Sequence, residues 1–310
     1  MIKHLKNNDI DRVKWDECIS ESPESNYFGY SFFLDIMCEN SWEALVLNDY
    51  EAVLPLPTKR KLFLNIVPVV FFAPQLGLYS KSGFSSQIMN DFLEKLPRKF
   101  HIFFMNLNTL WEDNQYDKKR NRSYFLSLNR DYETLYSSFS KNTKRNISKS
   151  KSYELKISHG GKIENLIDIF RTSFYGKQAN YSQNDYNNLT ELSKKSLENG
   201  SSDLIFAKNE KDEILAGIFI VFDKKNFYLL FSGMNDEGRE KGAMFALLNY
   251  FFEKNSNRDM QFLFCGSNND NLARFYSSFG ADAKYYSEIC FAKKGSILAK
   301  LAYKFRYKNL

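Results

Sequence analysis

The chain has 310 residues, of which 43% are hydrophobic and 16% aromatic, with 29 Phe and 19 Tyr. This composition supplies a large core and excludes an intrinsically disordered chain, and the length suffices for two domains of ordinary size. The 43 Lys and Arg residues outnumber the 37 Asp and Glu residues, so the net charge is +6. Because this excess is modest, its distribution along the chain matters more than its size.

The cysteines and histidines of this chain show no metal-binding spacing, so we expect no metal site. Isolated thiols of this kind pack as small apolar groups in a reducing compartment. The N-terminus lacks the apolar segment of a signal peptide. The longest apolar run, residues 65–74, is too short to span a bilayer and contains two prolines. We therefore expect a cytoplasmic protein. The cysteines are Cys18, Cys38, Cys265 and Cys290.

The first part of the chain predicts a helix followed by a sheet. Alternating apolar and polar residues over 42–79 indicate antiparallel strands, with turns at Asn48-Asp49 and Pro57. The elements expected next are a helix (84–100), a strand (101–110) and a polar connection (111–124). We place a domain boundary near Asn129, which divides the chain into residues 1–129 and 130–310.

The second part predicts helices and strands in an order that can be followed without gaps. The expected elements are a basic helix (133–152), a strand (153–159), two helices (163–174 and 183–200), three strands (202–209, 214–223 and 226–234), a polar loop (235–242), a helix (243–255), a strand (260–267), a helix (269–280) and a strand (283–292). Turn geometry is expected at Gly160-Gly161, and Gly200 is expected to cap a helix C-terminus.

This order, with a glycine-bearing basic loop before the helix at 243–255 and the segment NNDNLARFYSSFGA at 268–281, resembles the GNAT acyltransferase superfamily. Within it, the chain looks most like the two-domain Fem-type (FemAB-like) peptidyltransferases. SKNTKRNISKS at 140–150 resembles the basic helix that opens their second domain, and FFAPQLGLY at 71–79 is similar to a strand of their first. The resemblance implies an α/β fold of tandem GNAT-like domains, with mixed, mostly antiparallel sheets flanked by helices.

The loop before the helix at 243–255 is a candidate binding site for the phosphates of an acyl donor. GNAT enzymes have the pattern Gln/Arg-x-x-Gly-x-Gly/Ala here, and Met244 stands where that pattern has a small residue. Glycine lets backbone N–H groups approach an anion, and the helix N-terminus adds its positive end. A solvated connection between two core elements remains the alternative. The expected cofactor-binding residues are Gly238, Arg239, Lys241, Gly242 and Ala243, and we expect Gly242→Val to block donor binding without unfolding the chain.

Tyr276 is the candidate catalytic residue. It stands four residues before Gly280, where GNAT enzymes often have a tyrosine that protonates the departing thiolate. A phenol with a pKa near that of the thiol can deliver a proton without first being charged. Alternatively, Tyr276 belongs only to the apolar stripe of its helix, together with Leu272, Phe275 and Phe279.

The helix predicted at 133–152 carries five cations and no acidic residue between Glu133 and Glu154. Such a run is either a solvated face or an organised strip that binds an oligoanion with strong salt dependence. The resemblance to Fem-type proteins implies a phosphate-bearing substrate here, either a nucleotide-linked precursor or tRNA. Lys144 and Arg145 are the expected substrate-binding pair.

The tail at 293–310 has six cations, no acids and apolar residues at helical spacing. A basic amphipathic helix of this kind either packs on its own domain or lies on an anionic membrane surface, which would make the protein peripheral to the inner face of the membrane.

Together these patterns predict an N-acyltransferase that passes an acyl group from an activated donor, acyl-CoA being favoured, to an amine without a metal. The splay between the fourth and fifth GNAT strands, together with loop N–H groups, would polarise the carbonyl. Two alternatives stay open. One is a Fem-type enzyme that uses aminoacyl-tRNA and modifies a cell-wall precursor, and the other is a non-catalytic module that binds anions or membranes.

Overall fold

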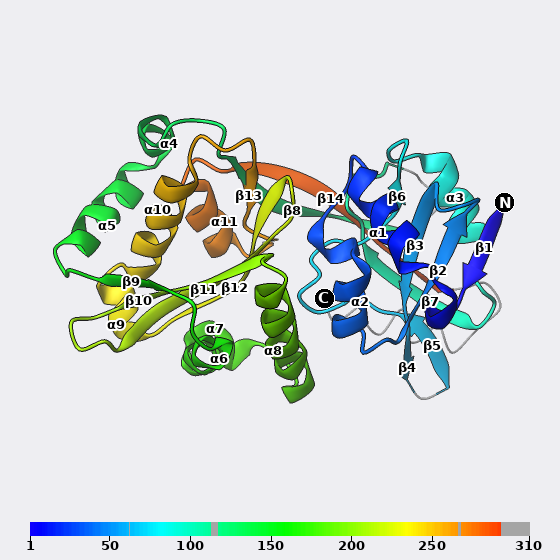
Figure 1. Cartoon of the computed structure of the whole chain (residues 1–310), viewed down its shortest axis with the longest axis horizontal. Helices are drawn as coiled ribbons and strands as arrows, with labels where there is room; N and C mark the ends of the chain where they lie inside the picture. Colours follow the sequence, from blue (N-terminus) through cyan, green and yellow to red (C-terminus); the bar gives the residue numbers. More distant parts are fainter. Residues whose placement is uncertain (62, 113–116, 266–267, 293–310) are drawn as a thin grey trace. The chain divides into compact units, whose positions relative to one another are not determined.

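The computed structural model of the chain describes residues 1–61, 63–112, 117–265 and 268–292. By its internal contacts the chain divides into two compact units (Figure 1). Unit 1 contains Met1–Asn121 and the described residues from Tyr285 onward, and unit 2 contains Arg122–Lys284. The first change of unit lies eight residues before the boundary predicted at Asn129. The return of the chain to unit 1 was not predicted.

Unit 1 contains a small antiparallel sheet in the order β1-β2-β3-β6, together with a second group of strands in the order β4-β5-β7-β14. In the second group, β5 and β7 are parallel and the other neighbours are antiparallel. The strands are β1 (Ile2–Leu5), β2 (Trp42–Leu47), β3 (Ala52–Pro57), β4 (Lys59–Lys61), β5 (Leu64–Val67), β6 (Tyr79–Ser80), β7 (Phe100–Asn106) and β14 (Asp282–Ala292, which enters unit 1 at Tyr285). The helices are η1 (Asn7–Asp9), α1 (Arg12–Glu21), η2 (Tyr27–Gly29), α2 (Ser31–Met37) and α3 (Ser86–Glu94).

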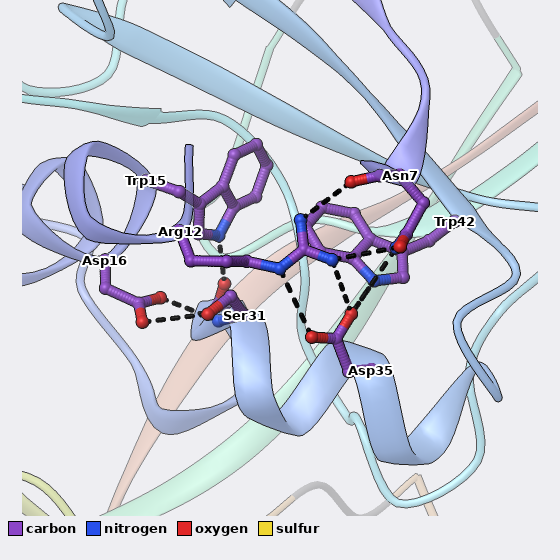
Figure 2. Close-up of polar contacts among 8 residues, drawn as sticks. Asn7, Arg12, Trp15, Asp16, Ser31, Asp35 and Trp42 are labelled. Atoms are coloured by element: carbon purple, nitrogen blue, oxygen red, sulfur yellow. Dashed lines mark hydrogen bonds and ion pairs between the residues drawn. The ribbon is translucent and has the colours of Figure 1, made fainter. Parts of the chain in front are cut away.

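One ion pair joins the N-terminal elements of unit 1 (Figure 2). The Arg12 guanidinium donates to both carboxylate oxygens of Asp35 at 2.9 and 3.2 Å, and to the side-chain and backbone oxygens of Asn7 at 3.0 Å each. The Trp42 indole N–H donates to the same carboxylate at 2.7 Å, and its ring lies under the guanidinium. Because a planar guanidinium can satisfy all these acceptors at once, η1, α1, α2 and β2 are tied at one point.

A second contact caps α2 from another helix. The Asp16 carboxylate of α1 accepts the backbone N–H of Ser31 at 2.7 Å and its hydroxyl at 2.8 Å, which satisfies a donor that the helix start leaves unpaired. Burial raises the pKa of Asp16, although these hydrogen bonds act in the opposite direction. The Trp15 indole donates to the Gly29 carbonyl at 2.9 Å and fixes η2 beside α1.

Unit 2 contains sheet strands in the order β8-β13-β12-β11-β10-β9, in which β12 and β13 are parallel and the other neighbours are antiparallel. Helix α10 packs on one face of this sheet, and α6 and α8 pack on the other (Figure 1). The strands are β8 (Asp117–Ser127, which enters unit 2 at Arg122), β9 (Lys156–His159), β10 (Ser202–Lys208), β11 (Ile214–Phe222), β12 (Asn226–Met234) and β13 (Gln261–Leu263). The helices are α4 (Tyr132–Ser138), α5 (Lys141–Lys151), α6 (Ile163–Thr172), α7 (Phe174–Gln178), α8 (Gln183–Glu198), α9 (Asp236–Glu240), α10 (Ala243–Asn255) and α11 (Asp270–Ser277).

The observed elements confirm the predicted α/β class with mixed, mostly antiparallel sheets, and correct it in three places. The polar connection at 111–124 contains the start of β8. The single helix predicted at 133–152 is two helices, because Phe139 is extended and the Ser140 hydroxyl caps α5 by accepting the N–H of Thr143. The loop predicted at 235–242 contains the short helix α9. Gly200 follows α8 with φ +63°, as the predicted cap requires.

No helix in the described part of the chain is long and apolar enough to cross a membrane. The basic tail at 293–310, for which we predicted a membrane-binding or self-packing helix, lies outside the described residues.

Candidate functional site

The two parallel strands at the centre of unit 2 separate after three residue pairs. Asn226 to Tyr228 of β12 pair with Gln261 to Leu263 of β13, where β13 ends, and β12 continues to Met234. The second half of β12 therefore extends beyond β13. It leaves room beside β12 for a ligand.

A β-bulge in β12 changes the face of the sheet on which the side chains after it lie. Leu229 pairs with Ile220 and Phe231 pairs with Phe219, so Leu230 is an extra residue without a partner on β11. Before the bulge, Leu229 packs in the core under α10, whereas Phe231 packs on the ring of Phe170 in α6, on the other face. A bulge re-aims the residues that follow it, and here it does so where the two strands separate.

A cavity of about 430 Å³ lies at this point, within unit 2. This volume is in the range of small-molecule sites. Its lining comes from both faces of the sheet and is mostly apolar and aromatic. The lining residues are Phe170, Ser173, Ala179, Tyr181, Leu229, Ser232, Gly233, Met234, Arg239, Met244, Asn271, Leu272, Phe275 and Tyr276. The cavity therefore brings together two of the predicted site residues, Arg239 and Tyr276.

Gly233 permits the α6 wall of the cavity to approach β12. A Cβ atom at this position would lie 3.2 Å from backbone and side-chain atoms of Phe170, closer than most real contacts. A side chain here would push α6 away from the sheet.

Tyr276 lies on α11, which is capped by Asn269, the residue before the helix, whose side chain accepts the N–H groups of Asn271 and Leu272. The Tyr276 ring stacks on Phe264 with 4.6 Å between ring centres, and the residue is only 8% exposed. The two sequence interpretations of this tyrosine are therefore compatible, because it belongs to the core cluster and also lines the cavity.

Arg239 supplies the positive charge of the cavity lining. Its side chain is half exposed and forms a 3.7 Å ion pair with Asp236, which is itself almost fully exposed. Exposed pairs of this kind contribute little free energy, so a ligand carboxylate or phosphate can replace Asp236 as the partner of Arg239 at small cost.

The other predicted cofactor-binding residues do not line this cavity in the described structure. Gly238 donates its N–H to the Asn235 side chain at 2.7 Å, and Lys241 and Gly242 donate theirs to carbonyls of α9. Ala243 is fully buried. The backbone N–H groups of Gly238, Lys241 and Gly242 thus donate to acceptors in α9 or in its N-cap residue. The N–H donors at the start of α10 are those of its own first turn.

The Lys241 ammonium is engaged as well. It forms ion pairs with Glu237 at 2.7 Å and Glu210 at 3.9 Å, and the hydrogen bond to Glu237 raises the pKa of Lys241.

The conformation of Gly242 contradicts the expectation that Gly242→Val would block donor binding without affecting the fold. Its φ of +70° is in the left-handed region, and an added Cβ would lie 3.2 Å from the Asn146 carbonyl oxygen of α5. The substitution would strain the backbone and press on α5, and so it is not a clean probe of ligand binding.

Lys144 and Arg145 lie on α5, outside the cavity lining. The buried positions of α5 are Thr143, Ile147 and Ser150, so its cations face outward. Lys144 donates to the Ser137 carbonyl at 2.8 Å and Arg145 to the Asn142 side chain at 2.7 Å. Within the described residues, neither has an acidic partner.

Helix α5, which carries the basic residues, and the cavity both lie next to the start of α10. Gly242, the residue before α10, lies against Asn146 and Ser150 of α5, and Met244 two residues later lines the cavity. In Figure 1, α5 and α10 run beside each other on the same face of the sheet.

Several lining residues were not predicted from the sequence. Phe170, Tyr181 and Asn271 come from three separate segments, and their spacing along the chain gives no sign that they meet. Ser232 and Gly233 did carry a signal, since a Ser-Gly pair interrupts an otherwise apolar strand and often marks a close approach.

No protein-family model matches the chain, and no curated protein matches it in sequence. Solved structures do match over nearly its whole length. FemX superposes with a TM-score of 0.66 at 10% identity, covering 98% of this chain and 99% of FemX. L-PGS from Bacillus licheniformis gives 0.57 at 12% identity, with 96% of each chain covered.

A third solved structure, the C-terminal domain of a putative lysylphosphatidylglycerol synthetase from Agrobacterium fabrum, superposes with a TM-score of 0.55 at 7% identity, covering 96% of each chain. Identities this low establish the architecture alone. The chain has the GNAT-like, Fem-type fold that its sequence resembles, and shares it with FemX and L-PGS.

Proposed function

We propose that the chain is an N-acyltransferase that moves an acyl or aminoacyl group from an activated donor to an amine in the cavity of unit 2. The observation that carries the proposal is the meeting of Tyr276 and Arg239 in one cavity beside the splayed strands β12 and β13. Sequence resemblance had suggested these parts separately, and their convergence supports a shared role.

In the proposed reaction the amine nitrogen attacks the acyl carbon, and a tetrahedral intermediate forms with negative charge on the former carbonyl oxygen. We propose that backbone N–H groups of β12 beyond the end of β13 donate to that oxygen. The bond from carbon to the leaving oxygen or sulfur then breaks, and the Tyr276 hydroxyl donates its proton to the leaving atom. Arg239 binds an anionic part of the donor.

The attacking amine must lose a proton, and the cavity lining has no side chain suited to accept it. No Asp, Glu, His, Cys or Lys is among the fourteen residues that line the described cavity. We therefore propose that the amine arrives neutral and that the proton its nitrogen loses on forming the amide passes to solvent or to a group on the acceptor, while Tyr276 regains its proton from solvent.

Of the two donors that the sequence left open, acyl-CoA and aminoacyl-tRNA, we now favour aminoacyl-tRNA. Lys241 and the amides of α9 already have partners within the chain, which disfavours a pyrophosphate against that segment. The cations of α5 have no acidic partner in the described structure and lie beside the start of α10, so they suit a long polyanion whose acyl end reaches the cavity. With this donor the reaction would take place in the cytoplasm, and a cell-wall precursor would place it at the inner face of the membrane.

The experiment compares Tyr276→Phe with Tyr124→Phe. Both tyrosines are 8% exposed and their rings lie 6.1 Å apart, but only Tyr276 lines the cavity. The purified chain is incubated with acyl-CoAs or aminoacyl-tRNAs and with hydroxylamine as a small amine, and formation of the hydroxamate is measured. We expect Tyr276→Phe to lower the rate by about 10²–10⁴-fold and Tyr124→Phe to change it by less than about threefold.

Two results would count against the proposal. An unchanged rate in Tyr276→Phe would reduce this tyrosine to a member of the core. Absence of turnover with every donor, in a parent chain that nevertheless binds polyanions, would support the non-catalytic alternative. A thermal-shift series with the same donors identifies which of them binds.

A further inference from the structure

The hairpin of β4 and β5 in unit 1 exposes an aromatic side chain next to three cations. Lys59, Arg60 and Lys61 form β4 and are all exposed, and β4 is the edge strand of its group. Phe63 lies between the two strands and is 82% exposed, the highest value for any aromatic residue described. Single exposed apolar residues are common on protein surfaces, but this one lies next to three exposed cations.

The cations of this hairpin are not neutralised. The sequence has no Asp or Glu between Glu51 and Asp91, and none of the ion pairs in the described structure includes Lys59, Arg60 or Lys61.

The groups packed nearest to the hairpin do not change this. Asn65 of β5 is held by the His101 ring and by the Lys99 carbonyl. The nearby Glu43 carboxylate is already shared by Lys99 and His4.

Another exposed apolar residue of unit 1 shows what a neutralised site looks like. Val13 on α1 is 78% exposed and is also flanked by two cations, Arg12 and Lys14. These cations form ion pairs with Asp35 and Asp49 respectively. Val13 therefore has a similar local sequence without the net positive field.

We propose that the β4–β5 hairpin docks the chain on an anionic lipid bilayer, with Phe63 in the interfacial layer and Lys59, Arg60 and Lys61 against the lipid headgroups. Aromatic rings are favoured at that depth, and unpaired Lys and Arg side chains are attracted to anionic headgroups. Lysines on an edge strand also prevent aggregation, but that role does not explain an exposed phenylalanine beside them.

The first test measures co-sedimentation of the full chain with vesicles of phosphatidylcholine alone or with 30% phosphatidylglycerol. Each cation near an anionic surface contributes about fivefold to the partition coefficient. Replacing Lys59, Arg60 and Lys61 together by Gln should therefore weaken binding to the anionic vesicles by on the order of a hundredfold. Phe63→Ser should weaken it by about tenfold. The replacement of the three cations should not affect the weak binding to neutral vesicles, whereas Phe63→Ser should weaken it.

The second test locates the hairpin in the bilayer by fluorescence. Trp15, Trp42 and Trp111 are at most 2% exposed, so a tryptophan introduced at position 63 is distinguishable from them. We expect brominated lipids to quench Phe63→Trp in anionic vesicles and to leave the matched control Val13→Trp unquenched.

Equal quenching at positions 13 and 63, or unchanged vesicle binding in both hairpin variants, would overturn the proposal. A dimeric parent chain and a monomeric Phe63→Ser variant with equal lipid binding would also overturn it. A second copy of the chain, and not a bilayer, would then contact the hairpin. Hydroxamate formation with soluble substrates should be the same in the hairpin variants and the parent, which separates this inference from the proposed activity.

Discussion

The backbone at Gly242 provides the most direct test of how the start of α10 is built. With φ +70° and ψ 29°, this residue is left-handed and has no side chain to cap the helix. An L-amino acid other than Asn or Asp loses about 1–2 kcal/mol in this conformation, whereas Asn adopts it several times more readily. Gly242→Ala should therefore be less stable than Gly242→Asn by about 1 kcal/mol.

The comparison of Ala with Asn isolates the backbone contribution. Both variants add the same Cβ, which would lie 3.2 Å from the Asn146 carbonyl oxygen, so the cost of that contact cancels in the difference. Thermal unfolding is followed by far-ultraviolet circular dichroism, and a difference of about 1 kcal/mol corresponds to about 2–4 °C for a unit of this size. All three tryptophans, Trp15, Trp42 and Trp111, lie in unit 1, so their fluorescence reports that unit separately.

Equal melting temperatures for Gly242→Ala and Gly242→Asn would refute the reasoning, since they would mean that position 242 is not held in the left-handed region. A loss of stability in Ala alone, with donor binding retained at low temperature, would show that Gly242 serves the fold and not the ligand directly.

The remaining predictions concern the α5 strip, the cavity wall and the cap of α2. Lys144→Ala combined with Arg145→Ala should weaken tRNA binding, measured by filter binding, by about 1.5–3 kcal/mol per charge-assisted contact. The slope of log K against log salt should fall by roughly 0.7–0.9 per contact, and an unchanged slope would mean that the cations of α5 are only a solvated face. Met244→Ala should enlarge the cavity and raise kcat/KM for bulkier acyl groups more than for acetyl, at a stability cost near the lower end of about 2–5 kcal/mol, and a flat acyl-length profile would contradict this. Burial raises the pKa of Asp16, so its contribution to stability is fully present below its unfolded pKa of about 3.9 and is lost as the pH rises through its folded pKa. Asp16→Asn should therefore remove this pH dependence of the free energy of unfolding, measured by urea unfolding at a series of pH values. The same pH dependence in the variant would exclude Asp16 as its source.

The order of elements in unit 2 could be predicted because each carries its own periodicity. The strands at 202–234 are apolar runs bounded by turn residues, and the helix at 243–255 follows a glycine. Tyr276 could be proposed because the segment resembles one in GNAT enzymes that often has a tyrosine four residues before a glycine, as Tyr276 stands before Gly280. These signals depend on residues within about ten positions of one another, which is the range over which sequence patterns are informative.

The features that were missed depend on distant partners. β14 pairs with β7, and their paired residues Glu288 and Asn106 are far apart in sequence, so nothing local indicates that the chain returns to unit 1. The bulge at Leu230 reverses the faces of the residues that follow it, whereas simple alternation would have placed Leu229 and Phe231 together. The break between α4 and α5 depends on the Ser140 cap, a single hydroxyl inside a run that otherwise favours one helix.

The distribution of charge around α10 bears on which donor the site accepts. The segment Asp236–Lys241 contains three acids and two bases, so it carries a net charge of −1, and Glu210 adds another negative charge beside Lys241. The dipole of α10 supplies only about +0.5 of an elementary charge at its start, which does not offset them. A pyrophosphate held there would meet a net negative field unless it displaced several carboxylates.

Helix α5, on the other side of the same helix start, carries five cations and no acid over Lys141–Lys151. A ligand with many phosphates is attracted to that face, while a compact anion at the mouth of α10 depends mainly on Arg239. The apolar cavity, which Arg239 and Met244 line, is large enough for an acyl or aminoacyl group and has few polar side chains for a nucleotide. Electrostatics and shape are therefore consistent with the proposed arrangement, in which α5 would hold a polyanionic carrier and the cavity would hold the group that is transferred.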